Sequence, residues 1–373
     1  MRIKFFIVLC TFLLSAHVFS QISPDVLVFE SDSSIVDSLK QSEYPYVFPF
    51  WGEKVQQRGI QLPLSAGLGV NYLWQESDLV ISSLSVGFNN NQMVDLNEVI
   101  RFNSAVASLS GINLRPDLWV LPFLNVYLVF ARSKTSTSID AGLWLPDSSN
   151  NWSEITTIST TANFDVTTFG FGLTPTMGIG GGWIALDMNF AWSDIAALSE
   201  PAFSFVFGPR LGKTFQLNDR DMTLAFWVGG FRLSISSDTN GSLNLSEVFP
   251  VDELQAKVDQ GMIRVEEAQI QVDGWWDGLT PVEQKNPVNI TKYETANRAI
   301  DKVGSTLSNL DGALSNAETA TVQYALEKGQ KEIWNFIVGA QFQLNRSWMI
   351  RAEYGFLGAR QQFLGGIQFR FGI

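Results

Sequence analysis

The chain ends with QFLGGIQFRFGI, residues 362–373, and this stretch decides the fold. Phe363, Ile367, Phe369 and Phe371 all stand at odd-numbered positions. Successive side chains of a β-strand point to opposite faces, so the pattern predicts a strand with one bulky apolar face. Because a soluble domain usually frays at its terminus, aromatic side chains displayed there indicate the closing strand of a β-barrel whose outer face meets lipid.

The same alternation recurs along most of the chain. In LPLSAGLGVNYLW, residues 62–74, the even positions carry Leu, Ala, Val, Tyr and Trp, and the odd positions carry mostly Pro, Ser, Gly and Asn. Segments of about ten residues with one apolar and one small or polar face, separated by turns, are typical of transmembrane barrels. Further segments of this kind are found at 118–130, 169–179, 184–192, 203–211, 222–228, 334–344 and 348–356.

A soluble β-sandwich also has alternating strands, but two features favour a membrane barrel. The apolar face is uniformly large, whereas the facing sheets of a sandwich must interdigitate side chains of different sizes. The opposite face is rich in Gly, Ser, Thr and Asn, which suits a crowded or water-filled lumen. Trp74, Trp192, Trp334 and Trp348 also stand at segment ends, where the aromatic belts of membrane proteins lie. We therefore expect an all-β membrane barrel with antiparallel, up-and-down transmembrane strands.

The closing segment also carries a resemblance to a known family. Gly366, followed at fixed spacing by Phe369 and Phe371, resembles the C-terminal recognition signal of bacterial outer-membrane β-barrel proteins. The resemblance covers about a dozen residues and does not identify a subfamily. It implies a location in the cell outer membrane, contact with outer-membrane lipid, and delivery to the barrel-assembly machinery.

The first 20 residues predict a cleavable secretory signal, with Arg2 and Lys4 ahead of a short apolar run. The only cysteine, Cys10, and the only histidine, His17, would leave with it. The formal charge would fall from −12 to −14, because two basic residues leave and no acid does. This acidic balance argues against nucleic acid as a partner. We expect no metal and no cofactor.

The strand count follows from the alternating segments. Roughly eleven can be distinguished, and single-chain bacterial barrels generally use an even number. We expect about 12 strands, with 10 and 14 as alternatives, and a missed strand within 89–103 or 132–165. The expected divisions are a signal at 1–20, a periplasmic N-terminal segment at 21–60, barrel strands at 61–240, a helical insertion at 241–330, and the last barrel strands at 331–373.

The insertion breaks the strand pattern. Apolar or small residues recur from Val251 to Val272, and again from Tyr293 to Tyr324, at spacings of three and four. This rhythm predicts two helices that pack along a seam, as an α-helical hairpin within 251–324. Short turns such as Gly180–Gly182 indicate the periplasmic side, so strand parity places the hairpin outside the cell. The alternative is that both helices lie across the barrel mouth.

Charged residues on the inward-facing parity are candidates for a lumen or selectivity site. They could select solutes, as charged rings do in pores, or pair with one another inside a filled barrel. Outer-membrane enzymes with a similar architecture rely on histidine, which the mature chain would lack, so no catalytic residue is assigned and an enzyme is not expected. The lumen candidates are Asp187, Arg210, Arg232, Arg351, Glu353 and Arg370.

Trp275 and Trp276 lie between the two expected helices, beside Asp273 and Asp277. Paired exposed indoles suit a ligand or partner face, but they could equally cap the end of the hairpin.

Two functions are consistent with this pattern. The first is a passive or selective channel or transporter for small solutes, with the hairpin as a lid or docking element. The alternative is a non-conducting barrel that presents the hairpin for adhesion, or for assembly with another envelope protein through residues 251–324. Barrels of this size can be sealed by inward side chains or can admit small solutes.

Overall fold

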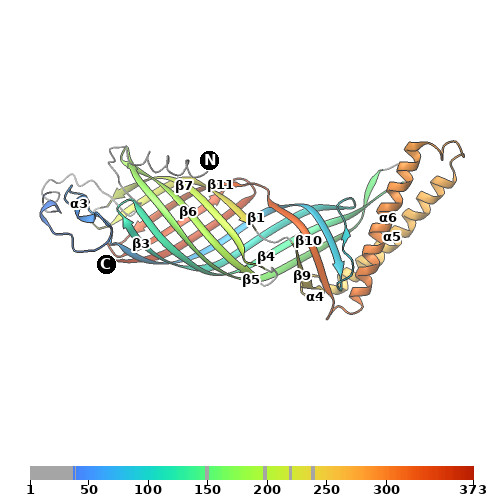
Figure 1. The fold of residues 1–373 in the computed structure, drawn as a ribbon, viewed down its shortest axis with the longest axis horizontal. Helices are drawn as coiled ribbons and strands as arrows, with labels where there is room; N and C mark the ends of the chain where they lie inside the picture. Colours follow the sequence, from blue (N-terminus) through green and yellow to red (C-terminus); the bar gives the residue numbers. More distant parts are fainter. Residues whose placement is uncertain (1–36, 38, 148–150, 196–199, 218–220, 237–239) are drawn as a thin grey trace, which may run out of the picture.

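Ten antiparallel strands close into a barrel in the computed structural model (Figure 1). The structure describes residue 37 and residues 39–373, apart from 148–150, 196–199, 218–220 and 237–239. The expected signal at 1–20 lies outside the described residues. The barrel strands are β1 (Ala66–Phe88), β3 (Ile100–Leu121), β4 (Leu124–Pro146), β5 (Trp152–Ile179), β6 (Gly182–Ile195), β7 (Ala202–Gln216), β8 (Thr223–Ser236), β11 (Trp334–Gln343), β12 (Trp348–Phe356) and β13 (Arg360–Phe371).

The seam between the first and last strands closes the barrel. β13 pairs with β1 from Ala66 opposite Phe371 to Ser77 opposite Arg360, and β1 pairs with β3 along its other edge. The expected count of about 12 strands is therefore corrected to ten. The segment 132–165, where a missed strand was expected, belongs to β4 and β5, which remain paired from Arg132–Thr167 to Pro146–Trp152. These strands exceed the usual membrane-spanning length because they continue beyond the barrel.

The two faces of the barrel wall differ as the alternation predicts. Phe190 contacts Phe171 on β5 and Phe205 on β7, with ring centroids 5.1 Å and 4.9 Å apart, and forms part of an aromatic band on the outer face. On the inner face, polar side chains such as Gln341 and Glu353 are buried. Among the described residues, no helix combines the length and apolar character needed to cross a bilayer.

The ends of β1, β3, β4 and β5 extend past the barrel rim and form a curved sheet (Figure 1). After its pairing with β13 ends, β1 pairs with β10 (Thr321–Gln330), from Leu79 opposite Gln330 to Phe88 opposite Val322. β9 (Asn240–Asn244) pairs with the free edge of β10, and β2 (Val94–Asp95) pairs with β1. These three short strands lie outside the closed barrel, and with the long strands they form an extended sheet at one end of the molecule.

The helical hairpin packs on this extended sheet and projects away from the barrel (Figure 1). It consists of α4 (Leu245–Val248), α5 (Val251–Asp277) and α6 (Pro287–Leu314). The Asn286 side chain accepts a hydrogen bond from the Val288 N–H and caps α6, with Pro287 in its first turn. The packed pair of helices is thus observed. However, Tyr324, expected in the second helix, lies in β10, because α6 ends at Leu314.

The seam between the helices follows the three-and-four spacing. Val258 on α5 and Val303 and Leu307 on α6 are almost completely buried in one apolar cluster. Gly261 permits close helix contact, since a Cβ atom there would stand 2.9 Å from the Leu307 Cδ1 atom. The cluster also includes Leu143 and Leu145 of β4, so the extended sheet supplies part of the hairpin's core.

The N-terminal segment closes over the opposite rim. It contains α3 (Gly52–Gln56), and the Phe48 and Phe50 N–H groups donate hydrogen bonds to the carbonyl oxygens of Ile373 and Val120, at 3.1 Å and 2.9 Å. The C-terminus and α3 therefore lie together, at the end of the molecule away from the helices (Figure 1).

Candidate functional site

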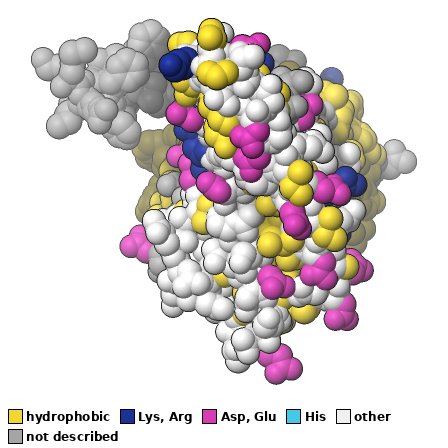
Figure 2. All heavy atoms as spheres, turned by 90° about the vertical axis from the view of Figure 1, so that its right-hand side faces the viewer, with side chains coloured by type: hydrophobic (Ala, Val, Ile, Leu, Met, Phe, Trp, Pro, Cys, Tyr) yellow, Lys and Arg dark blue, Asp and Glu magenta, His cyan; other side chains and the backbone are white. Residues whose placement is uncertain are grey.

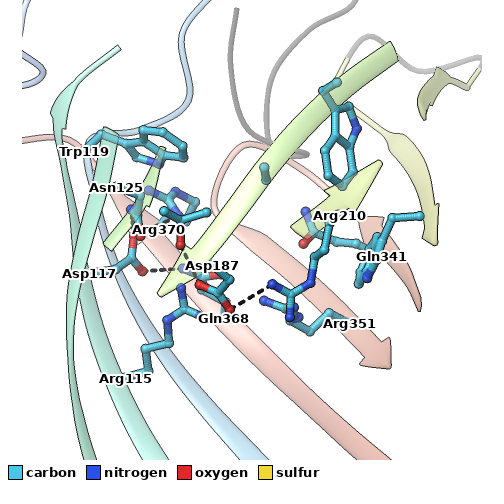
Figure 3. Close-up of a pocket in the computed structure, with 14 residues that line it drawn as sticks. Arg115, Asp117, Trp119, Asn125, Asp187, Arg210, Gln341, Arg351, Gln368 and Arg370 are labelled. Atoms are coloured by element: carbon cyan, nitrogen blue, oxygen red, sulfur yellow. Dashed lines mark hydrogen bonds and ion pairs between the residues drawn. The ribbon is translucent and has the colours of Figure 1, made fainter. Parts of the chain in front are cut away.

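The lumen near the C-terminal rim is filled by a cluster of charged and aromatic side chains (Figure 3). Five of the six lumen candidates point inward and belong to it or contact it: Asp187, Arg210, Arg351, Glu353 and Arg370. Arg232 does not. It is exposed and stands opposite Phe207 and Trp334 on neighbouring strands, both on the outer face. It shares the parity of Phe226, so its assignment to the lumen is corrected.

Arg210 bridges two carboxylates from different strands. Its Nη1 lies 2.9 Å from Asp187 Oδ2. Its Nε and Nη2 donate to the two carboxylate oxygens of Glu353, at 3.0 Å and 3.1 Å. Paired guanidinium–carboxylate hydrogen bonds of this geometry are stronger and more directional than neutral ones. Arg210 therefore ties β7 to β6 and to β12 across the lumen.

Each of the two carboxylates receives further hydrogen bonds. Tyr127 and Thr174 donate their hydroxyl groups to Asp187 Oδ1, both at 2.7 Å. The Trp227 indole N–H donates to Glu353 Oε2 at 2.9 Å. A buried charge is tolerated only when it is paired and hydrogen-bonded, and these contacts meet that requirement.

A second ion pair lies beside the first and reaches the seam. Arg370 Nη1 lies 3.1 Å from Asp117 Oδ1, and Arg370 Nε donates to the Leu64 carbonyl oxygen at 3.0 Å. Asn125 and Gln368 also donate to Asp117. The closing strand is thus bound through its side chains to β3 and to the segment that precedes β1.

Several members of this cluster are not among the lumen candidates that the sequence predicts. Arg115 and Asp117 lie on the inward face of β3, because Leu114 and Pro116 share the outward parity. Both residues precede the segment 118–130, whose alternation predicts a single strand. It contains the turn at residues 122–123, which separates β3 from β4. The alternation upstream of that turn could have identified both residues.

Two tryptophans occupy much of the remaining lumen. Trp183 and Trp227 are 3% exposed, and their ring centroids lie 6.2 Å apart. Glycine on the neighbouring strand makes room for each ring, because a Cβ atom at Gly212 or Gly339 would stand 2.2 Å from an indole carbon. The small residues on the inner face therefore reflect a crowded lumen.

The cluster leaves a cavity of about 60 Å³. This volume holds only a few water molecules. Four arginines, Arg115 among them, face three carboxylates there, so the formal charge of the cluster is positive by one. Arg115 lies over the Tyr127 ring, 3.6 Å from its centroid. The arrangement locks strands together across the lumen and narrows any passage at this level.

The other candidates lie outside the lumen. Trp276 stacks on Tyr293, with centroids 4.4 Å apart, while Trp275 contacts Trp276 at the end of α5. The stacking favours a structural role at the end of the hairpin for Trp276. Both indoles remain partly exposed.

The three residues of the expected assembly signal lie at the seam or beside it. Gly366 stands opposite Asn71, and a Cβ atom at Gly366 would be 2.0 Å from the Asn71 amide oxygen. Phe369 and Phe371 point outward, with ring centroids 6.1 Å apart. The glycine and the alternating aromatics thus correspond to close packing inside the barrel and an apolar surface outside it.

These features define a closed antiparallel β-barrel of the outer-membrane type. No family model matches the chain, and no curated protein matches it. Solved structures with a similar fold include an outer membrane channel from Pseudomonas putida F1, at 11% identity and TM-score 0.26, over 83% of this chain and 96% of that one. The toluene transporter TbuX of Ralstonia pickettii matches at 8% identity and TM-score 0.27, over 83% and 90%.

The transport unit of the autotransporter AIDA-I from Escherichia coli matches at 6% identity and TM-score 0.32, over 83% of this chain and 90% of that one. All three similarities are distant. The barrel is established by the strand pairing of the chain itself.

Proposed function

We propose that the protein is an outer-membrane barrel whose lumen is sealed and which presents its helical hairpin, on the extended sheet, outside the cell. The observation that carries this proposal is the filled lumen. Arg210 binds two carboxylates from two strands, and the indoles of Trp183 and Trp227 occupy the space beside them. An eight-stranded barrel is just filled by its side chains, so a ten-stranded one can be sealed by large residues such as these.

The side of the membrane assigned to the hairpin follows from the lengths of the turns. Short connections, such as Gly180–Gly181 between β5 and β6, lie at the rim that carries the C-terminus. Bacterial barrels have short periplasmic turns and longer extracellular loops. The hairpin, at the opposite end, would therefore face the exterior, and the segment around α3 would lie in the periplasm.

A selective channel with the hairpin as a lid is the second candidate function. It is favoured by the polar cavity of about 60 Å³ and by the excess positive charge around it. If the ion pairs of Arg210 exchanged partners, this cavity could become part of a narrow path for anions.

Electrical recording distinguishes the two functions. We expect the native chain, inserted into planar bilayers, to show no discrete conductance steps, because the cluster around Arg210 closes the lumen. The measurement is single-channel current at both polarities. Discrete steps that enlarge when residues 251–314 are replaced by a short linker would instead establish a gated channel.

Insertion has to be shown independently of conductance. The double variant Trp183→Ala/Trp227→Ala removes two large rings from the plug and serves as the control. We expect brief, small steps from it in the same bilayers. Faster migration of unboiled protein on a denaturing gel identifies the folded barrel in every preparation.

A further inference from the structure

An apolar cavity lies beyond the barrel, beneath the helical hairpin. Its walls are the extended parts of β1, β3, β4 and β5 together with β10, and α6 covers it through Thr306 and Leu310. Its volume is about 210 Å³. An apolar cavity of about 150 Å³ already accepts benzene, so this one can hold a substituted ring or a short aliphatic chain.

The lining is almost entirely apolar on both sides. On β4 and β5 it includes Ile139, Leu143, Ile158 and Phe164, which lie on the inward face of the extended sheet. The concave face of this sheet is therefore only partly covered by packed side chains. Part of it borders the cavity, and Leu143 and Leu310 belong both to this lining and to the packed cluster around Leu307.

One charged side chain, Lys328, lines the cavity. Along β10, Tyr324, Leu326 and Lys328 occupy alternate positions and all face it, and Lys328 stands opposite Ile81 of β1. Within the part of the chain that the structure describes, Lys328 forms no hydrogen bond and no ion pair. Its side chain is exposed to solvent, and the apolar groups along one side of it lower the pKa of its ammonium group by partly removing it from water.

The ammonium group of Lys328 stands at the open edge of the apolar cavity, where it is hydrated in the empty protein and can exchange part of that hydration for a carboxylate. The acidic side chains on this end of the molecule lie over the outer surface (Figure 2), and none of them lines the cavity. The cavity thus combines an apolar body with one cationic end.

We propose that this cavity binds a small apolar molecule that carries one carboxylate, with the apolar part beneath α6 and the carboxylate on Lys328. The site extends the proposed presentation role, since it gives the exposed end of the protein a ligand. It does not depend on whether the lumen conducts.

Binding can be tested on the full chain in phosphatidylcholine nanodiscs, whose lipid carries no net charge and no carboxylate. We expect 4-ethylbenzoate to bind in isothermal titration calorimetry, and its neutral analogue 4-ethylbenzyl alcohol to bind more weakly. Lys328→Met keeps the aliphatic stem but removes the charge. It should weaken benzoate binding by about tenfold or more, since hydrogen bonds to charged groups are the strong ones, and leave the alcohol unchanged.

Two further variants make the test specific. Ala162→Leu adds bulk to the cavity wall and should abolish binding of both compounds. Lys134→Met removes an exposed lysine on β4 that lies outside this cavity and should change neither. The proposal is overturned if the native chain binds neither compound, or if Lys328→Met binds benzoate as well as the native chain does. Gel migration confirms that each variant is folded, and the conductance result has no bearing on this outcome.

Discussion

Replacing Glu353 by alanine is expected to lower the free energy of unfolding by about 3 to 5 kcal/mol, the usual cost of leaving one partner of a buried ion pair alone. Glu353 is 4% exposed and accepts two hydrogen bonds from Arg210 and one from Trp227. Without it, Arg210 keeps only Asp187 as a carboxylate partner. The formal charge of the cluster then rises from plus one to plus two, and Arg351 also loses the carboxylate that lies 3.7 Å from its Nη2 atom.

The measurement is urea unfolding in detergent micelles, followed by the loss of the fast-migrating band. Glu76→Ala is the matched control, because Glu76 is an exposed carboxylate on the barrel strand β1. We expect it to change the free energy of unfolding by less than about 0.5 kcal/mol. A similar small change for Glu353→Ala would show that the lumen cluster does not hold the strands together.

The contribution of the ion pair to stability can be separated from that of its surroundings by removing both partners. We expect the double variant Glu353→Ala/Arg210→Ala to lose less stability than the sum of the two single variants, by about 1 to 3 kcal/mol. Asp187 would still accept from Tyr127 and Thr174, so it is not left without partners. Strict additivity would contradict a direct interaction between Glu353 and Arg210.

The alternation of side chains predicted the wall of the barrel from sequence because each strand has two chemically different sides. Phe369 and Phe371 point outward and Arg370 points inward, as their spacing indicates. The inward positions of Asp187 and Glu353 followed from the same rule. Arg232 shares the even parity of Phe226 in the same strand, so the same rule places it on the outer face, and its assignment to the lumen did not follow the alternation of its own strand.

The strand count and the apolar cavity could not be obtained in this way. Alternation continues through β4 and β5 beyond the barrel, and it does not reveal where lipid ends. β10 follows α6 after only a few residues, and Tyr324 fits the helical spacing as well as the strand spacing. Which of the two forms depends on a partner far away in the chain, since Tyr324 pairs with Val86 of β1. The sequence around Lys328 therefore does not predict that this residue lines the cavity.

The outward parity itself is tested by placing a charge on the aromatic band. Phe190→Arg puts a guanidinium group near the middle of β6, between Phe171 and Phe205, where the proposed orientation exposes it to lipid. An arginine on the lipid-facing side costs about 2 to 4 kcal/mol at the bilayer midplane. We expect a loss of this size in the free energy of folding into phosphatidylcholine bilayers.

Two controls separate lipid exposure from other causes. Phe190→Leu keeps an apolar group and should cost less than Phe190→Arg, since only part of the aromatic contact is lost. Asn163→Arg introduces the same charge at an exposed position of β5, in the extended part of the strand where it pairs with β4 beyond the barrel, and should be nearly neutral. Equal costs for Phe190→Arg and Asn163→Arg would mean that water, not lipid, surrounds Phe190. The paired strands fix which side of the wall each residue faces. That result would therefore contradict the proposed membrane location but not the barrel fold.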